Sequence, residues 1–141
     1  MKILLAVDGS SFTTKAVEYI AAHLDSFQGE RELHLLHVKA PIPVAHARAV
    51  AGSEAVEDFY KEEASAALAP AETLLKQKNI PFQSGYKVGE VAETIKAYAE
   101  QHGIDMIVMG SHGHSALKNL VIGSVTTKML ATTSVPVLIV R

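Results

Sequence analysis

Short apolar runs alternate along the chain with longer segments in which apolar residues recur at helical spacing. Residues 3–7 form a continuous apolar run, which predicts a strand buried on both faces. Apolar residues then recur at positions 16, 17, 20, 21 and 24, which predicts one face of a helix with Ser10 or Ser11 as its N-cap. The same pattern predicts further strands at 33–38, 81–87, 105–109 and 136–140, and further helices at 54–78, 91–102 and 124–132.

Proline and glycine mark the one long break in this pattern. Pro41, Pro43 and Gly52 predict a loop over residues 39–53. Pro70 lies inside the next predicted helix, where it is expected to kink the helix or divide it in two.

The alternation of strands and helices predicts an α/β fold in one domain over residues 1–141. We expect a five-stranded parallel, doubly wound, Rossmann-like sheet with right-handed crossovers and helices on both faces. Such sheets bind ligands beyond the carboxyl ends of their strands, where the strand order reverses. Asp8 follows the first predicted strand and Gly110 ends the fourth, so adjacent strands would bring both to one crevice.

Composition excludes several classes of function. The chain has four Tyr, four Phe and no Trp, which argues against an aromatic platform for nucleic acid. Thirteen basic and fifteen acidic residues give a net charge of −2, without the basic surface that nucleic acid requires. No cysteine is present, which excludes disulfides and thiol chemistry. Without a signal-peptide core or an apolar run long enough for a membrane, we expect a soluble, cytoplasmic protein.

The segment 110–125 carries the most informative motif, G-x2-G-x9-G-S. It lacks both the P-loop and the dinucleotide fingerprint. Gly110 and Gly113 would let the backbone approach a ligand closely or adopt a positive φ. Gly123 and Ser124 stand where the last helix should begin, and free N–H groups at a helix N-terminus form a natural phosphate site. The Ser124 hydroxyl would either cap the helix or bind a phosphate oxygen.

With this motif the chain resembles the universal stress proteins of the UspA type, in their ATP-binding branch. The resemblance covers essentially the whole chain. It rests on residues 3–10 (ILLAVDGS), the strand ending in His37 and Val38, residues 105–110 (DMIVMG), the glycine motif and residues 135–141 (VPVLIVR).

The resemblance implies the strand order 3-2-1-4-5 and an adenine nucleotide, ATP or AMP, in the crevice, with Mg²⁺ accompanying ATP. It places Asp8 near the ribose and adenine, and the Val38 backbone against adenine. The nucleoside would also contact aliphatic walls and backbone at the first and fourth strands, and the phosphates would lie against the glycine motif. The implied set is Ala6, Val7, Asp8, Val38, Met109, Gly110, Gly113, His114, Gly123, Ser124 and Val125.

Individual residues keep alternative roles at this level. His114 stands where the family often has Arg or Lys, so its charge beside phosphate would depend on pH. Ala116 stands where Gly is frequent. Lys118 would either reach a phosphate or be solvated, and Asp8 would either contact the ligand or only start the following helix. Asp105 begins its strand at the opposite end from the crevice, which favours a structural role.

Three functions follow in order of preference. The first is a stress-response protein that binds adenine nucleotide and presents residues 39–53 and the following helix to a partner. The second is a slow ATPase or autophosphorylating enzyme that uses a crevice Ser or Thr, although no Ser-His-Asp set can be assembled from spacing. The third is a dimeric interaction module without a ligand. His112 and His114 alone would make a poor metal site.

The last strand predicts self-association. Val137–Val140 is wholly apolar and would lie at an edge of the sheet in the order 3-2-1-4-5. An exposed apolar edge invites pairing with another chain, so we expect a homodimer in which the last strands meet across a two-fold axis.

Overall fold

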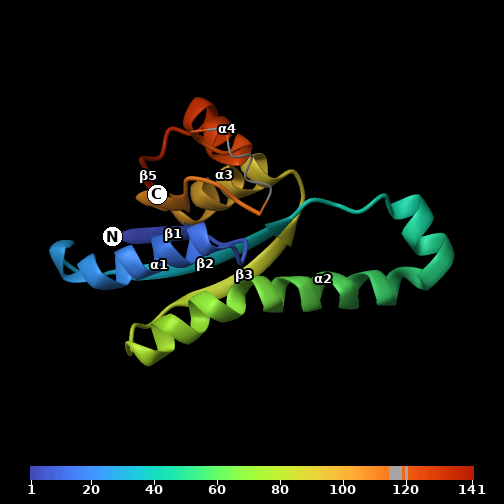
Figure 1. Cartoon of the computed structure of the whole chain (residues 1–141), viewed down its shortest axis with the longest axis horizontal. Coiled ribbons are helices and arrows are strands. Elements are labelled where there is room, and N and C mark those ends of the chain that lie inside the picture. The colour runs from blue at the N-terminus through green and yellow to red at the C-terminus, as the bar shows by residue number, and fades with distance from the viewer. Residues whose placement is uncertain (115–118, 120) are drawn as a thin grey trace.

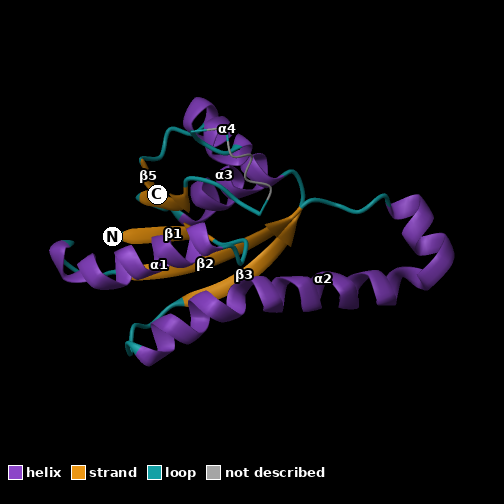
Figure 2. Ribbon diagram, in the orientation of Figure 1, coloured by secondary structure: helices purple, strands orange, loops and turns teal. Residues whose placement is uncertain are grey.

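The computed structural model describes residues 1–114, 119 and 121–141. Five parallel strands form one sheet in the order β3-β2-β1-β4-β5 (Figure 2). This confirms the predicted sheet and its strand order. The strands are β1 Lys2–Ala6, β2 Glu32–Lys39, β3 Gln83–Val88, β4 Met106–Gly110 and β5 Val137–Val140. The helices are α1 Ser11–His23, α2 Val44–Gln77, α3 Val91–His102 and α4 Ser124–Thr132, with a 3₁₀ turn at Leu24–Ser26.

The sheet separates two apolar cores because successive residues of each strand point to opposite faces. Ile3 and Leu5 of β1 pack into one core with the buried faces of α1 and α2. Leu4 packs into the other core with α3 and α4. Figure 2 shows α3 and α4 together on one side of the sheet. Burial on both faces explains why the central strands are continuous apolar runs in the sequence.

Strand register brings the carboxyl ends of β1, β2 and β4 to one edge. Ala6 pairs with Leu36 of β2, and Leu5 pairs with Val108 of β4. The Val7 N–H extends the β1–β2 ladder by donating to the Leu36 carbonyl at 2.9 Å. The chain leaves β1 and β4 at the same edge of the sheet, where the site was predicted.

The prediction of a loop over residues 39–53 holds for residues 40–43 and was wrong for residues 44–53. Helix α2 begins at Val44, with Pro43 at its N-cap. Proline is well tolerated at a helix start, where its missing N–H has no partner to lose. Gly52, at φ 80° and ψ 164°, interrupts the helical course inside α2. Figure 1 shows the first part of α2 turned away from the long remainder and beyond the sheet.

Pro70 does not divide α2, since Gly52 is its one residue with non-helical φ and ψ in the described structure. Pro70 lies on the exposed side of the helix. Water can therefore satisfy the carbonyl that loses its intrahelical partner, which lowers the cost of the proline. Among the helices of the described residues, none has both the length and the apolar character to span a membrane.

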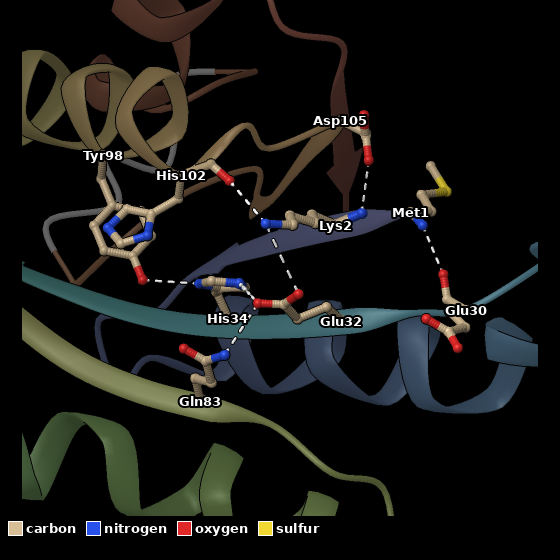
Figure 3. A network of polar contacts seen from close by, with 9 residues as sticks. All are labelled: Met1, Lys2, Glu30, Glu32, His34, Gln83, Tyr98, His102 and Asp105. Carbon is tan, nitrogen blue, oxygen red and sulfur yellow. Dashed lines mark hydrogen bonds and ion pairs between the residues drawn. The ribbon is translucent and has the colours of Figure 1, made fainter.

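The amino ends of the strands carry a polar network of their own (Figure 3). The Asp105 carboxylate accepts a 2.7 Å hydrogen bond from the Lys2 backbone N–H, which gives Asp105 a structural role. The buried His34 ring lies between the Glu32 carboxylate and the Tyr98 hydroxyl, at 2.8 Å from each. The hydrogen bond with His34 is the main cause that lowers the pKa of Glu32, and burial raises the pKa of Tyr98. These groups serve as hydrogen-bond partners for one another. They lie at the opposite end of the sheet from the carboxyl ends of the strands.

Candidate functional site

A cavity of about 690 Å³ opens at the carboxyl ends of β1, β2 and β4. It lies on the α3 and α4 side of the sheet and extends to the first turn of α1. Every residue that the sequence assigned to the nucleotide site lines this cavity: Ala6, Val7, Asp8, Val38, Met109, Gly110, Gly113, His114, Gly123, Ser124 and Val125. The structure thus brings together site residues from three stretches that are widely separated in the sequence: residues 6–8, residue 38 and residues 109–125.

Sequence reasoning missed part of the lining. The missed residues are Thr13, Leu36, Lys39, Ala40, Val91, Ile95, His112 and Thr126. Leu36 precedes Val38 by two positions and therefore shares its face of β2, a signal that the period of a strand supplies. Val91 and Ile95 lie one helical turn apart on the face of α3 that packs against the sheet.

The cavity is lined both by apolar side chains and by the start of a helix. Leu36, Val91 and Ile95 contribute apolar side chains, and none of the described lining residues is Phe, Tyr or Trp. The first turn of α4 also lines the cavity, and the Gly123 N–H donates to the Ser111 carbonyl at 2.7 Å, which joins this turn to the segment after β4. An occupant with an apolar ring and an anionic group would match this combination.

Asp8 joins the start of α1 to the glycine motif. Its Oδ1 accepts hydrogen bonds from the Ser10 backbone N–H at 2.9 Å and from the Thr13 hydroxyl at 2.6 Å. The N-cap itself is Ser10, whose hydroxyl accepts from the Thr13 N–H. Burial raises the pKa of the Asp8 carboxyl, but the hydrogen bonds from Ser10 and Thr13 and the charge of His114 outweigh it, so that the pKa lies below its usual value. Asp8 is therefore ionised at neutral pH.

Close packing against protein atoms explains the glycines of the motif. A Cβ on Gly110 would lie 2.7 Å from the Phe12 Cβ, and one on Gly113 would lie 2.6 Å from Asp8 Oδ2. A Cβ on Gly123 would lie 3.2 Å from the His112 Cα. The alternative that Gly110 or Gly113 adopts a positive φ is wrong, since neither lies in that region.

The first turn of α4 lines the cavity. Its N-cap is Gly123, which has no side chain, and within the described part of the chain no side chain caps the helix. Ser124 is the first helical residue and is exposed, so its hydroxyl does not act as the cap. The buried Thr126 hydroxyl donates to the Gly110 carbonyl at 3.1 Å, which ties this turn to the end of β4. An uncapped helix N-terminus is a favourable position for an anion.

Two histidines follow β4 in this segment. His112 Nδ1 lies 3.0 Å from the Ser111 hydroxyl, and its ring packs beside Phe12 with centroids 5.1 Å apart. His114 Nε2 lies 2.6 Å from the Asp8 backbone carbonyl and so links the two segments that flank the cavity. Ala116 and Lys118, which the sequence also singled out, lie outside the described residues.

Metal ligation by protein side chains has little support at this site. Within the part of the chain that the structure describes, no three or more His, Cys, Asp or Glu side chains gather in a position to hold a metal ion. A Mg²⁺ ion that arrives with a nucleotide would be held mainly by phosphate oxygens and water, as this cation commonly is.

The universal stress protein family model matches residues 1–141. Universal stress protein YxiE of Bacillus subtilis is 34% identical over 147 aligned residues, which cover 99% of this chain and 98% of YxiE. Universal stress protein Slr1230 of Synechocystis is 33% identical over 140 residues, and the match covers 99% of this chain but only 42% of Slr1230. This chain therefore spans less than half of that relative.

Solved structures agree with this family. The structure of MJ0577 from Methanocaldococcus jannaschii superposes with a TM-score of 0.81 at 29% identity, over 99% of this chain and 94% of that chain. A universal stress protein in complex with cAMP gives 0.73 at 19% identity, over 100% and 97% of the two chains. The Archaeoglobus fulgidus universal stress protein in complex with dAMP gives 0.69 at 20% identity, over 100% and 98%. With a family match over its full length, the chain belongs to the universal stress protein family.

Proposed function

We propose that this protein binds an adenine nucleotide, ATP or AMP, in the cavity between β1, β2 and β4 and acts as a regulatory protein in stress response. The observation that carries the proposal is that apolar side chains and the first turn of α4, which no described side chain caps, line the same cavity. A nucleotide has the matching parts, since its base is apolar on both faces and its phosphate is anionic. The complexes of two structural relatives with cAMP and dAMP support this choice of ligand.

In this proposal the base lies against aliphatic side chains and backbone. Ala6, Val38 and Met109 line the cavity from three adjacent strands, and Ile95 lines it from α3. Because Phe, Tyr and Trp are absent from the described lining residues, the base would be held mainly by van der Waals contact with aliphatic side chains. Asp8, which is ionised and hydrogen-bonded to the start of α1, would accept hydrogen bonds from ribose hydroxyls in this proposal.

The phosphates in this proposal lie at the first turn of α4. Backbone N–H groups of Ser124 and Val125 and the Ser124 hydroxyl would donate to phosphate oxygens. Gly113 and Gly123 keep the surrounding backbone close together at this end of the cavity. With ATP, the accompanying Mg²⁺ would neutralise phosphate charge.

Equilibrium titration of nucleotide-stripped protein with ATP, ADP, AMP and adenosine tests this function. Ser124→Ala should weaken AMP binding by about ten- to 150-fold, because a charge-assisted hydrogen bond contributes roughly 1.5–3 kcal/mol. Its matched control is Thr132→Ala, which removes a hydroxyl at the far end of the same helix, where it donates to the Lys128 carbonyl. Equal effects of the two variants would contradict the phosphate position, and no binding at millimolar nucleotide would overturn the function.

The same samples separate a binding protein from the slow ATPase. Phosphate release from ATP is measured over hours with Mg²⁺ present. We expect tight retention of nucleotide without release of phosphate, and steady turnover by the wild type would favour the enzyme instead.

We further propose that the protein is a homodimer through β5. This strand lies at the edge of the sheet, and all four of its residues are only half-buried. Ile139→Lys should yield a monomer in sedimentation analysis, because it places a charge on that edge. Val88→Lys is the matched control, since Val88 is exposed on β3 at the opposite edge. A dimer that survives Ile139→Lys with an unchanged circular dichroism spectrum would refute pairing through β5.

A further inference from the structure

His114 holds a position that fixes which of its ring nitrogens can meet a ligand. Nε2 lies 2.6 Å from the backbone carbonyl oxygen of Asp8. A carbonyl oxygen only accepts hydrogen bonds, so Nε2 must carry a hydrogen whether the ring is neutral or protonated. The ring also lines the cavity beside Gly113, Gly123 and Ser124. Nδ1 is therefore the ring nitrogen that remains for a ligand.

Protonation reverses the hydrogen-bonding character of that nitrogen. In the neutral ring Nδ1 carries a lone pair and accepts, whereas in the protonated ring it carries a hydrogen and donates. Ionised phosphate oxygens only accept. A neutral His114 would therefore turn a lone pair toward an acceptor, and a protonated His114 would form a charge-assisted hydrogen bond.

Among the residues that the structure describes, the other charged and titratable groups around the cavity do not replace this change. Asp8 belongs to the segment after β1, and the lowered pKa of its carboxyl keeps it ionised throughout the range in which an ordinary histidine titrates. Lys39 of β2 forms a 2.8 Å ion pair with Glu63 of α2, and the pKa of Glu63 is lowered by that hydrogen bond. His112 lies on the segment of His114 and is in contact with Ser111 and Phe12. The first turn of α4 adds a fixed partial positive charge.

We propose that His114 makes phosphate binding pH-dependent by donating from Nδ1 to a nucleotide phosphate only when the ring is protonated, while Nε2 stays on the Asp8 carbonyl. This rests on the proposed nucleotide site and assigns its regulation. Affinity for the phosphate-bearing ligand would rise as the pH falls through the range of histidine titration. Affinity for the base and ribose would not change through this residue. The protein would then hold nucleotide more tightly under mild acidification.

Titration with AMP and with adenosine, without Mg²⁺, tests the inference between about pH 5.5 and about pH 8, where histidine changes its charge. Three proteins are compared: the wild type, His114→Gln and His114→Arg. Glutamine keeps a donor for the Asp8 carbonyl but cannot gain a charge, and arginine is charged at every pH. Because the AMP phosphate also titrates in this range, each wild-type affinity is divided by that of His114→Arg at the same pH.

The expected result is a wild-type to His114→Arg affinity ratio for AMP that falls about tenfold from the acidic to the alkaline end, the size of one charge-assisted hydrogen bond. For adenosine the wild-type to His114→Arg affinity ratio should stay constant. For AMP, the affinity of His114→Gln divided by that of His114→Arg should also stay constant with pH. A constant wild-type ratio for AMP would overturn the inference, as would a pH dependence retained in His114→Gln. If AMP binds but the wild-type to His114→Arg affinity ratio does not change with pH, the proposed nucleotide site is retained and only the proposed role of His114 is rejected. If neither AMP nor adenosine binds, both proposals fail.

The ring signal of His114 in a proton NMR titration supplies an independent readout. Since coupling between proton and ligand is reciprocal, saturating AMP should move the midpoint of that signal to higher pH. Adenosine should leave the midpoint where it is in the free protein. A midpoint that AMP does not move would contradict a hydrogen bond from Nδ1 to phosphate.

Discussion

Replacing Gly110 by alanine should push the start of α1 away from the end of β4. The added Cβ would lie 2.7 Å from the Phe12 Cβ, 2.8 Å from the Phe12 carbonyl carbon and 3.0 Å from the Phe12 carbonyl oxygen. All three atoms belong to the backbone or to the first side-chain carbon, so no flexible side-chain end can move aside. Relief requires a shift of the helix start itself, and this part of the molecule borders the cavity.

Forcing an extra methyl group into a well-packed site costs about 1–3 kcal/mol. Gly110→Ala should therefore lower the free energy of unfolding by about that amount, which corresponds to roughly a five- to 150-fold change in the unfolding equilibrium. Gly85→Ala is the matched control, because Gly85 lies in β3 and a Cβ there would meet nothing within 4 Å. Its effect should be neutral or stabilising by about 0.5–1 kcal/mol, since alanine loses less backbone entropy on folding than glycine.

Urea unfolding followed by circular dichroism measures both variants, and the midpoint reports stability if the slope is unchanged. Nucleotide titration of the same samples then reports whether the displaced helix start distorts the cavity. AMP affinity should fall in Gly110→Ala and stay at the wild-type value in Gly85→Ala. Equal stabilities of the two variants would refute the packing explanation for Gly110.

Two further substitutions test the hydrogen bonds of Asp8 at the start of α1 and the glycine C-cap of α3. Asp8→Asn should destabilise the protein by about 1–3 kcal/mol at neutral pH, because a charged acceptor of two hydrogen bonds is lost. Since the folded pKa of Asp8 is lowered, its contribution is present above the unfolded pKa and disappears as the pH falls through the folded pKa. The variant should thus lose less stability than wild type on acidification below about pH 4, and parallel acid profiles would contradict this. Gly103→Ala should cost about 1–2 kcal/mol, because Gly103 caps α3 at φ 62°, and an unchanged melting temperature would show that the cap tolerates a side chain.

Most elements of the fold could be predicted because buried parallel strands are continuous apolar runs in the sequence. Strands β1 and β4 are covered on both faces, so apolar residues are favoured at successive buried positions of both strands. Strand β3 is mostly exposed, and its predicted range of 81–87 accordingly differed from the observed Gln83–Val88. The order of the strands came with the family resemblance, since hydrophobic periodicity does not determine which strands are neighbours.

The start of α2 could not be predicted from local preference. Pro43 and Gly52 both disfavour the interior of a helix, and together they indicated a loop. In the structure Pro43 stands at the N-cap, where it costs little, and Gly52 takes a conformation with positive φ that turns one helical stretch into the next. Both residues mark helix boundaries, which composition alone does not distinguish from loop positions.

The meeting of Asp8 and Gly110 could be predicted from chain topology, because the carboxyl ends of adjacent parallel strands share one edge. The assignment of the other site residues rested on the family resemblance and on the glycine motif that carries it. Val91, Ile95 and Thr126 were missed because helices α3 and α4 bring them to the cavity through tertiary packing. The periodicity of those helices predicts a buried face but not which part of it borders an opening.

The spacing of the motif glycines has a structural cause that is separate from any ligand. Gly110 lies against Phe12, Gly113 against the Asp8 carboxylate, and Gly123 against the backbone at His112. Each glycine lets its part of the chain lie close to protein atoms, so packing alone favours glycine at these positions whether or not a ligand binds. Loss of nucleotide binding in a variant such as Gly123→Val would consequently not identify a phosphate contact, since the same change disturbs the backbone around it. Substitutions of Ser124 and His114 distinguish a phosphate contact from a disturbed backbone more clearly. Their side chains line the cavity, and the glycines that allow the close packing of this segment remain unchanged.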